Sequence, residues 1–131
     1  MLEADPDARP FAYALLRVVP RVERGERVNV GLVLFCRQLD FLELSTQVDH
    51  PRLAALAPEL DPDALRGRLA AIAGVVRGEA GAGPIAGLTQ SERFGWVVSP
   101  SSTIIQPSRV HTGLTGDPGA TLARLFELLV A

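Results

Sequence analysis

The segment from Val28 to Cys36 constrains the fold more than any other part of the chain. It reads Val-Asn-Val-Gly-Leu-Val-Leu-Phe-Cys and is the run richest in β-branched residues, which favour strands. Alternation places Val28, Val30, Leu32 and Leu34 on one face of this strand, and Asn29, Gly31, Val33 and Phe35 on the other. Because both faces are largely apolar, we expect a central strand in a sheet that is covered on at least part of both sides.

The segments on either side of Val28 to Cys36 also predict strands. Phe11 to Val19 alternates imperfectly between apolar positions, with Phe11, Tyr13, Leu15, Arg17 and Val19 on one face. Leu39 to Ser45 follows a turn at Arg37-Gln38. Consecutive strands usually pair with each other, so the three segments predict an antiparallel meander.

Three helices are expected, and aspartate and proline mark their starts. The strongest pattern is Pro62 to Arg77, where apolar residues recur at helical spacing behind the capping residue Asp61. A short helix is expected to run from the region of Pro51, at its first position, to Ala57. A terminal helix is expected to begin at Pro118, with Asp117 as its cap.

The stretch before the terminal helix predicts a loop and two short strands. Gly78 to Gly87 is rich in glycine and alanine and predicts a flexible loop, and Trp96 to Val98 and Thr103 to Gln106 predict strands around a Pro-Ser-Ser turn. Together these elements predict an α+β protein with an antiparallel or mixed sheet of about five strands, two longer helices and one short helix. We expect a single domain over residues 11–131 behind a flexible N-terminal arm, residues 1–10.

The composition excludes several classes of function. All 13 basic residues are arginine, which excludes mechanisms built on a Schiff-base lysine or a phosphate-loop lysine. Cys36 is the only cysteine, so an intramolecular disulfide is excluded and a reducing compartment, the cytoplasm, is expected. Met1 to Pro10 lacks the basic opening and the apolar run of a secretory signal, so no export is expected, and no apolar run approaches the roughly 20 residues that span a membrane. The net charge of -2 argues against a uniformly basic nucleic-acid binder.

An Arg-rich turn is the first candidate site. It contains Arg21, Arg24, Glu26 and Arg27, followed by Asn29 inside the central strand. Guanidinium groups on such a turn can bind a phosphate or a carboxylate, and a buried Asn must find hydrogen-bond partners. The simpler interpretation is a solvated turn with one structural Asn.

The segment from Ser99 to Thr112 is the second candidate, together with Arg93 just before it. Its polar side chains include Ser102, Thr103, Gln106, Ser108 and His111. They can line an anion site or a partner groove, but no nucleophile, base and orienting carboxylate stand at a recognisable spacing. The simpler interpretation is a turn and an edge strand stabilised by hydroxyl groups. His50 and His111 fit no metal-binding pattern, and we expect neither a metal nor a cofactor.

Two blocks of the sequence resemble one bacterial family. The first is Val18 to Phe35, in which a basic turn and Val-Asn-Val-Gly lead into an apolar strand. The second is Arg93 to Trp96 with Ser102 to Ser108 and His111 to Leu114. Both are similar to the family of domain of unknown function 3037, and the resemblance spans nearly the whole chain. It implies no activity or cofactor, but it does imply a partner, because members are often encoded beside kinases similar to the HipA type.

Hypotheses of different classes follow. The leading one is a non-catalytic interaction module whose polar segments bind a protein partner, for which the resemblance implies a HipA-like kinase. The alternative is a small enzyme that processes phosphate or nucleic acid. In that enzyme Arg24, Arg27 and Arg93 would hold phosphate, Glu26 would act as acid or base, and His111 would carry a proton.

Sequence-tolerant nucleic-acid binding has little support, because Phe94 and Trp96 alone are candidates for an exposed stacking surface. No membrane partner is expected.

Overall fold

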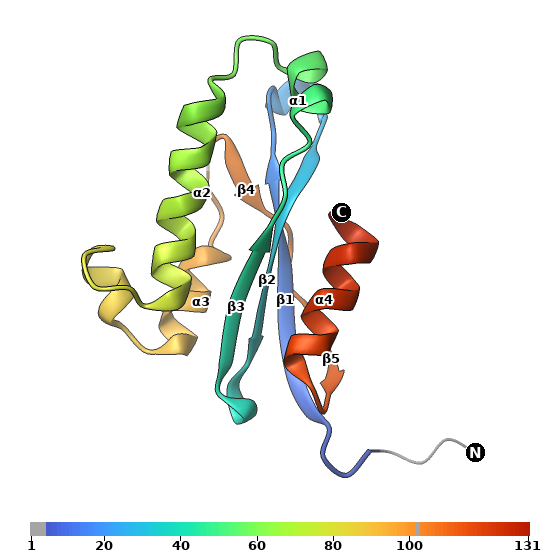
Figure 1. Ribbon diagram of the computed structural model, residues 1–131, viewed down its shortest axis with the longest axis vertical. Coiled ribbons are helices and arrows are strands. Elements are labelled where there is room, and N and C mark those ends of the chain that lie inside the picture. The colour runs from blue at the N-terminus through green and yellow to red at the C-terminus, as the bar shows by residue number, and fades with distance from the viewer. Residues whose placement is uncertain (1–4, 102) are drawn as a thin grey trace.

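The computed structural model describes residues 5–101 and 103–131, and its middle layer is an open antiparallel sheet (Figure 1). Its strands are β1 (Arg9–Val18), β2 (Val28–Cys36), β3 (Phe41–Thr46), β4 (Ile105–Pro107) and β5 (His111–Thr115). The order across the sheet is β3, β2 and β1, and both β4 and β5 pair with the remaining edge of β1. β5 pairs with the first half of β1 and β4 with its last residues, so two short strands in succession complete that edge.

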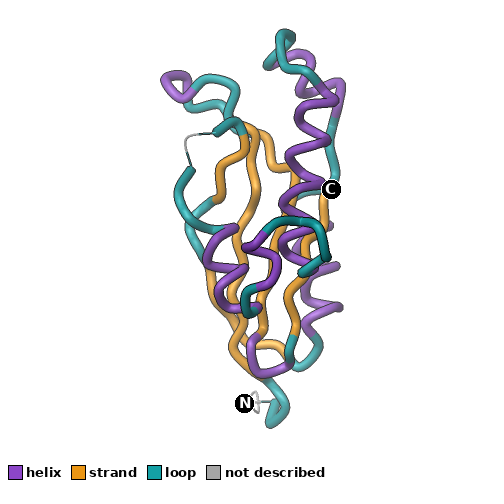
Figure 2. The backbone as a smooth tube through the Cα atoms, turned by 90° about the vertical axis from the view of Figure 1, so that its left-hand side faces the viewer, coloured by secondary structure: helices purple, strands orange, loops and turns teal. Residues whose placement is uncertain are grey.

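Helices cover both faces of this sheet. They are α1 (His50–Leu56), α2 (Pro62–Arg77), α3 (Gln90–Val97) and α4 (Pro118–Leu129). α2 and α3 lie on one side of the sheet, α4 lies on the other, and α1 lies at one end (Figure 1). The strands run along the long axis of the molecule (Figure 2). Among the described residues, no helix is long and apolar enough to cross a membrane.

The α+β class, the meander of β1, β2 and β3, and the three expected helices are confirmed. The side chains of Asp49, Asp61 and Asp117 each accept a hydrogen bond from a backbone N–H in the first turn, at 2.9–3.1 Å. Each cap satisfies an N–H that has no partner inside its helix. Pro51 occupies the second helical position rather than the first.

A fourth helix, α3, occupies the region where a strand was expected, so the prediction of a strand at Trp96 to Val98 is wrong. Thr89 and Glu92 form a capping box, in which the backbone N–H of each residue donates to the side chain of the other, at 3.3 and 3.2 Å. The helix then buries Phe94 and Val97, three positions apart, in the core. Capping and helical spacing therefore outweigh the β-propensity of the Trp-Val-Val run.

Several other boundaries differ from the expected ones. β4 begins two residues later than expected, and β5 has no counterpart among the predicted strands. β3 also begins two residues late, because Arg37–Leu39 form a 3-10 turn that ends at Asp40, whose φ is a left-handed 53°. The predicted loop from Gly78 to Gly87 contains a further 3-10 turn at Pro84–Gly87.

A β-bulge interrupts the pairing of the two longest strands. Leu16 pairs with Gly31 and Arg17 pairs with Asn29, so Val30 is an extra residue on β2 without a partner on β1. A bulge of one residue breaks the alternation of side chains between the two faces of a strand. It therefore decides which side chains of β2 face which helices.

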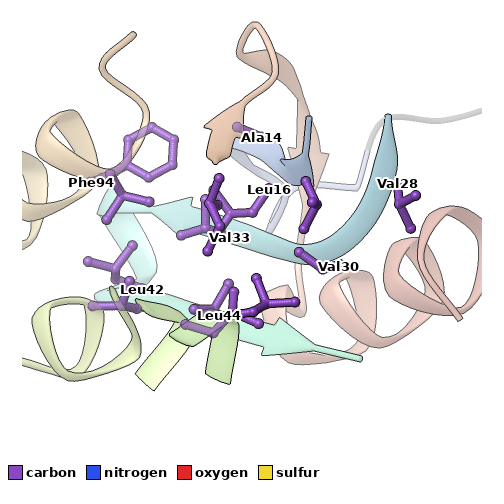
Figure 3. Packing of buried hydrophobic residues seen from close by; sticks show 14 of the residues in the cluster. Ala14, Leu16, Val28, Val30, Val33, Leu42, Leu44 and Phe94 are labelled. Carbon is purple, nitrogen blue, oxygen red and sulfur yellow. The ribbon is translucent and has the colours of Figure 1, made fainter. Parts of the chain in front are cut away.

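The bulge moves part of the central strand to the other face of the sheet. Val28 and Val30 lie in the core on the side of α2 and α3, together with Val33 (Figure 3), whereas Leu32 and Leu34 lie in the core beneath α4. The expectation that Val28, Val30, Leu32 and Leu34 share one face is therefore wrong. Coverage of the strand on both sides is confirmed, because Val33, Leu32 and Leu34 are all fully buried.

Candidate functional site

A row of polar side chains crosses three strands near one end of the sheet. Arg17 on β1 pairs directly with Asn29 on β2 and with Gln106 on β4, and we call these three residues the polar row. Residues that face each other in an antiparallel pair point to the same side of the sheet. That side carries α4, because the amide Nδ2 of Asn29 donates a hydrogen bond to the carbonyl oxygen of Leu129 at 3.0 Å. Strand pairing thus brings one residue of each candidate segment beside Arg17.

The charge of Arg17 has little compensation from its surroundings. Its side chain is half-buried, and its buried Nε has no hydrogen-bond partner in the described part of the chain. Burial lowers the pKa of Arg17, and the positive charge of Arg27 lowers it further. Within residues 5–101 and 103–131, neither guanidinium forms an ion pair with a carboxylate. Because arginine stays charged at neutral pH, these two cations can bind an anion.

The other arginines of the turn are paired with carboxylates. Arg24 lies 2.8 Å from Glu26, and Arg21 lies 3.7 Å from Glu59 in the loop that follows α1. The arginines of both pairs are exposed, so each pair contributes little to stability. Arg27 is the arginine of this turn that pairs with no carboxylate among the described residues.

The second candidate segment is only partly available for binding. Ser102 lies outside the described residues. The hydroxyl of Thr103 donates to the carbonyl of Ile105 at 2.9 Å, and the amide Nε2 of Gln106 donates to the carbonyl of Thr103 at 3.2 Å. These bonds hold the entry to β4, where Gln106 pairs with Arg17 on β1.

Ser108 bridges the gap between β4 and β5. It is buried, and its Oγ accepts a hydrogen bond from the N–H of Leu15 at 2.8 Å and donates one to the carbonyl of Arg109 at 2.8 Å. We expect Ser108→Ala to lower the free energy of unfolding by about 1–3 kcal/mol, because the Leu15 N–H would lose its partner. Urea denaturation measures this loss. The exposed Ser91→Ala is the control, and an equal loss in both variants would contradict the bridging role.

His111 and Glu26 do not come together. His111 pairs with Tyr13 on β1, and the two rings stack with their centroids 5.1 Å apart. Glu26 precedes Val28, which pairs with Val18, five residues along β1 from Tyr13. That separation is about 16 Å of strand, too far for the acid and base roles of the enzyme hypothesis at one bond. Among the described residues, no three His, Cys, Asp or Glu side chains are grouped to hold a metal ion.

Arg93 lies apart from the polar row, in α3 on the other side of the sheet. Its guanidinium donates to the carbonyl of Leu88 at 2.7 Å and to that of Val76 at 3.4 Å. The side chain therefore satisfies carbonyl groups around the end of α2. It does not join the other predicted arginines.

Arg17 is the residue of the site that the sequence interpretation missed. It stands between Leu16 and Val18, which are both buried. A charged residue inside an apolar strand must reach solvent or find partners. That single charge was the available signal, and it could not show which strands flank Arg17.

A comparison with protein families found a match over nearly the whole chain. The model of a family described as "Protein of unknown function (DUF3037)" matches residues 13–130, a span that contains the polar row and both candidate segments. In the same comparisons, no curated protein and no solved structure matched the chain.

Proposed function

Because this chain belongs to the DUF3037 family of proteins of unknown function, we propose its role from the surface described above. It is a non-catalytic interaction module that binds an acidic segment of a partner protein at the polar row and Arg27. The observation that carries this proposal is the pair of like charges, Arg17 and Arg27, for which the described residues supply no carboxylate. A carboxylate from a partner would relieve their repulsion and accept hydrogen bonds from the accessible part of their guanidinium groups.

A short acidic segment suits this surface better than a nucleic acid. Glu23 and Glu26 lie in the Arg-rich turn and Glu59 pairs with Arg21, so these carboxylates would repel a continuous line of phosphates. Proteins can also hold a single-stranded nucleic acid by stacking its bases on exposed aromatic side chains. Phe94 is buried, however, and Trp96 is exposed on α3, on the other side of the sheet. A single carboxylate needs only one guanidinium fork.

The partner itself is proposed from the resemblance alone. Kinases of the HipA type are the class that the resemblance implies, so we propose that the acidic segment belongs to such a kinase. The polar row defines the chemistry of that segment, which must present a carboxylate at the end of the sheet where α4 finishes. This proposal assigns no catalytic role to the chain.

Capture of the tagged protein from its native host, followed by mass spectrometry, tests this function. We expect wild type to retain a kinase, and Arg27→Ala to lose it, because the variant removes one of the two uncompensated cations. Arg21→Ala is the matched control, since Arg21 already pairs with Glu59 and should retain the partner. Added salt should weaken capture. Equal capture by wild type and Arg27→Ala would exclude this surface as the interface, and a different captured protein would exclude the kinase.

A further inference from the structure

A groove of about 280 Å³ lies on the face of the sheet opposite the polar row. Leu16, Val97 and Ile105 form its buried floor, and its walls come from α2, α3 and the segment that enters β4. The volume is just below the roughly 300–1,000 Å³ of pockets that hold drug-sized molecules. The groove therefore suits one small ligand and not a polymer.

Two exposed side chains at this groove offer complementary chemistry. Trp96 is 45% exposed, although its indole is the largest apolar side chain of the protein. A flat aromatic face of this kind stacks with a planar ring, which contributes about 1–3 kcal/mol for a nucleic-acid base. Arg68 on α2 is exposed and pairs with no carboxylate among the described residues. Its guanidinium can hold an anionic group by parallel hydrogen bonds.

Three hydroxyl groups along the groove have already used their protons. Ser99 donates to the carbonyl of Gly95 at 2.7 Å, and Thr103 donates to that of Ile105 at 2.9 Å. The 2.8 Å contact between Ser101 and Thr103 must then be donated by Ser101, because each hydroxyl carries one proton. Each of the three oxygens can therefore only accept further hydrogen bonds. A ligand must therefore bring N–H or O–H donors to this side of the groove.

We propose that this groove binds a nucleoside monophosphate, a function beyond the partner binding proposed above. The base stacks on Trp96, and the phosphate contacts Arg68. The N–H and O–H groups of the base and ribose donate to the oxygens of Ser99, Ser101 and Thr103. Each part of the ligand thus meets a group that recognises it. A nucleoside lacks the anion and a sugar phosphate lacks the ring, so both bind more weakly.

Fluorescence gives a site-specific test, because Trp96 is the only tryptophan of the chain. The full chain is titrated with AMP, with adenosine and with ribose 5-phosphate, and indole emission is followed. The same titrations are made with Arg68→Ala. Arg66→Ala is the matched control, because Arg66 lies on the same helix and pairs with Asp63 at 2.8 Å. Circular dichroism verifies that each variant is folded.

We expect AMP to quench the emission of Trp96 in a saturable way and to bind at least about tenfold more tightly than adenosine or ribose 5-phosphate. A charge-assisted hydrogen bond has about this effect. Arg68→Ala should lower the affinity for AMP to that for adenosine, and Arg66→Ala should leave it unchanged. The absence of saturable quenching by AMP in the folded wild type would overturn the proposal. Equal affinity of wild type and folded Arg68→Ala for AMP would also overturn it.

Discussion

We expect replacement of Phe94 by alanine to lower the free energy of unfolding by about 3–5 kcal/mol. Phe94 is 8% exposed, and the centroid of its ring lies 5.3 Å from that of Phe35 on β2. It belongs to the core between α3 and the sheet (Figure 3). Alanine would leave a cavity there, because the surrounding side chains relax only in part. Urea denaturation followed by circular dichroism measures the change.

Trp96→Ala is the control for this loss of stability. Trp96 lies two residues away in the same helix, but it is 45% exposed, against 8% for Phe94. We therefore expect it to change the free energy of unfolding by less than about 1 kcal/mol. Equal losses in the two variants would show that α3 does not pack through Phe94.

The second large effect is expected for Arg17→Met, which should raise the free energy of unfolding and lower the affinity for the partner. Methionine keeps most of the apolar stem but removes a buried Nε without a partner and the repulsion from Arg27. We expect the free energy of unfolding to rise by roughly 1 kcal/mol. Affinity for the captured partner should fall about 30-fold or more, because loss of one side of a buried charge pair costs about 2–5 kcal/mol.

These two effects have opposite signs, which separates a functional role of Arg17 from a structural one. Denaturation and calorimetric titration with the captured partner measure them on the same sample. Arg37→Met, in the exposed turn after β2, is the control and should change neither quantity appreciably. If Arg17→Met destabilised the protein and bound the partner normally, Arg17 would be a structural residue and the proposed interface would be wrong.

Local chemistry explains why three of the helices could be predicted from sequence. A cap acts within its own first turn, and Asp49, Asp61 and Asp117 each bond to a backbone N–H two or three residues away. The capping box of α3 at Thr89 and Glu92 is equally local, so the sequence contained the signal for this helix too. The β-propensity of the Trp-Val-Val run favours a strand, but the cap and the helical spacing prevail, so the predicted strand is wrong.

The polar row depends on information that is not local. Asn29 and Gln106 reach opposite sides of Arg17 only through the register of β2 and β4 against β1. The bulge at Val30 then decides that Asn29 faces α4. Register follows from the packing of whole faces, and no nearby residue specifies it. Sequence could therefore name Arg27, Asn29 and Gln106 as candidates, but it could not place them around Arg17.

The most direct test of the interface is the NMR spectrum of the arginine Nε–H groups, recorded on isotope-labelled protein during titration with the captured partner. We predict that the signals of Arg17 and Arg27 shift, because a bound carboxylate changes the electrostatic environment of both guanidinium groups. The signals of Arg68 and Arg93, on the other side of the sheet, should stay in place. Binding that leaves Arg17 and Arg27 unchanged would contradict the proposal that this end of the sheet holds the acidic segment.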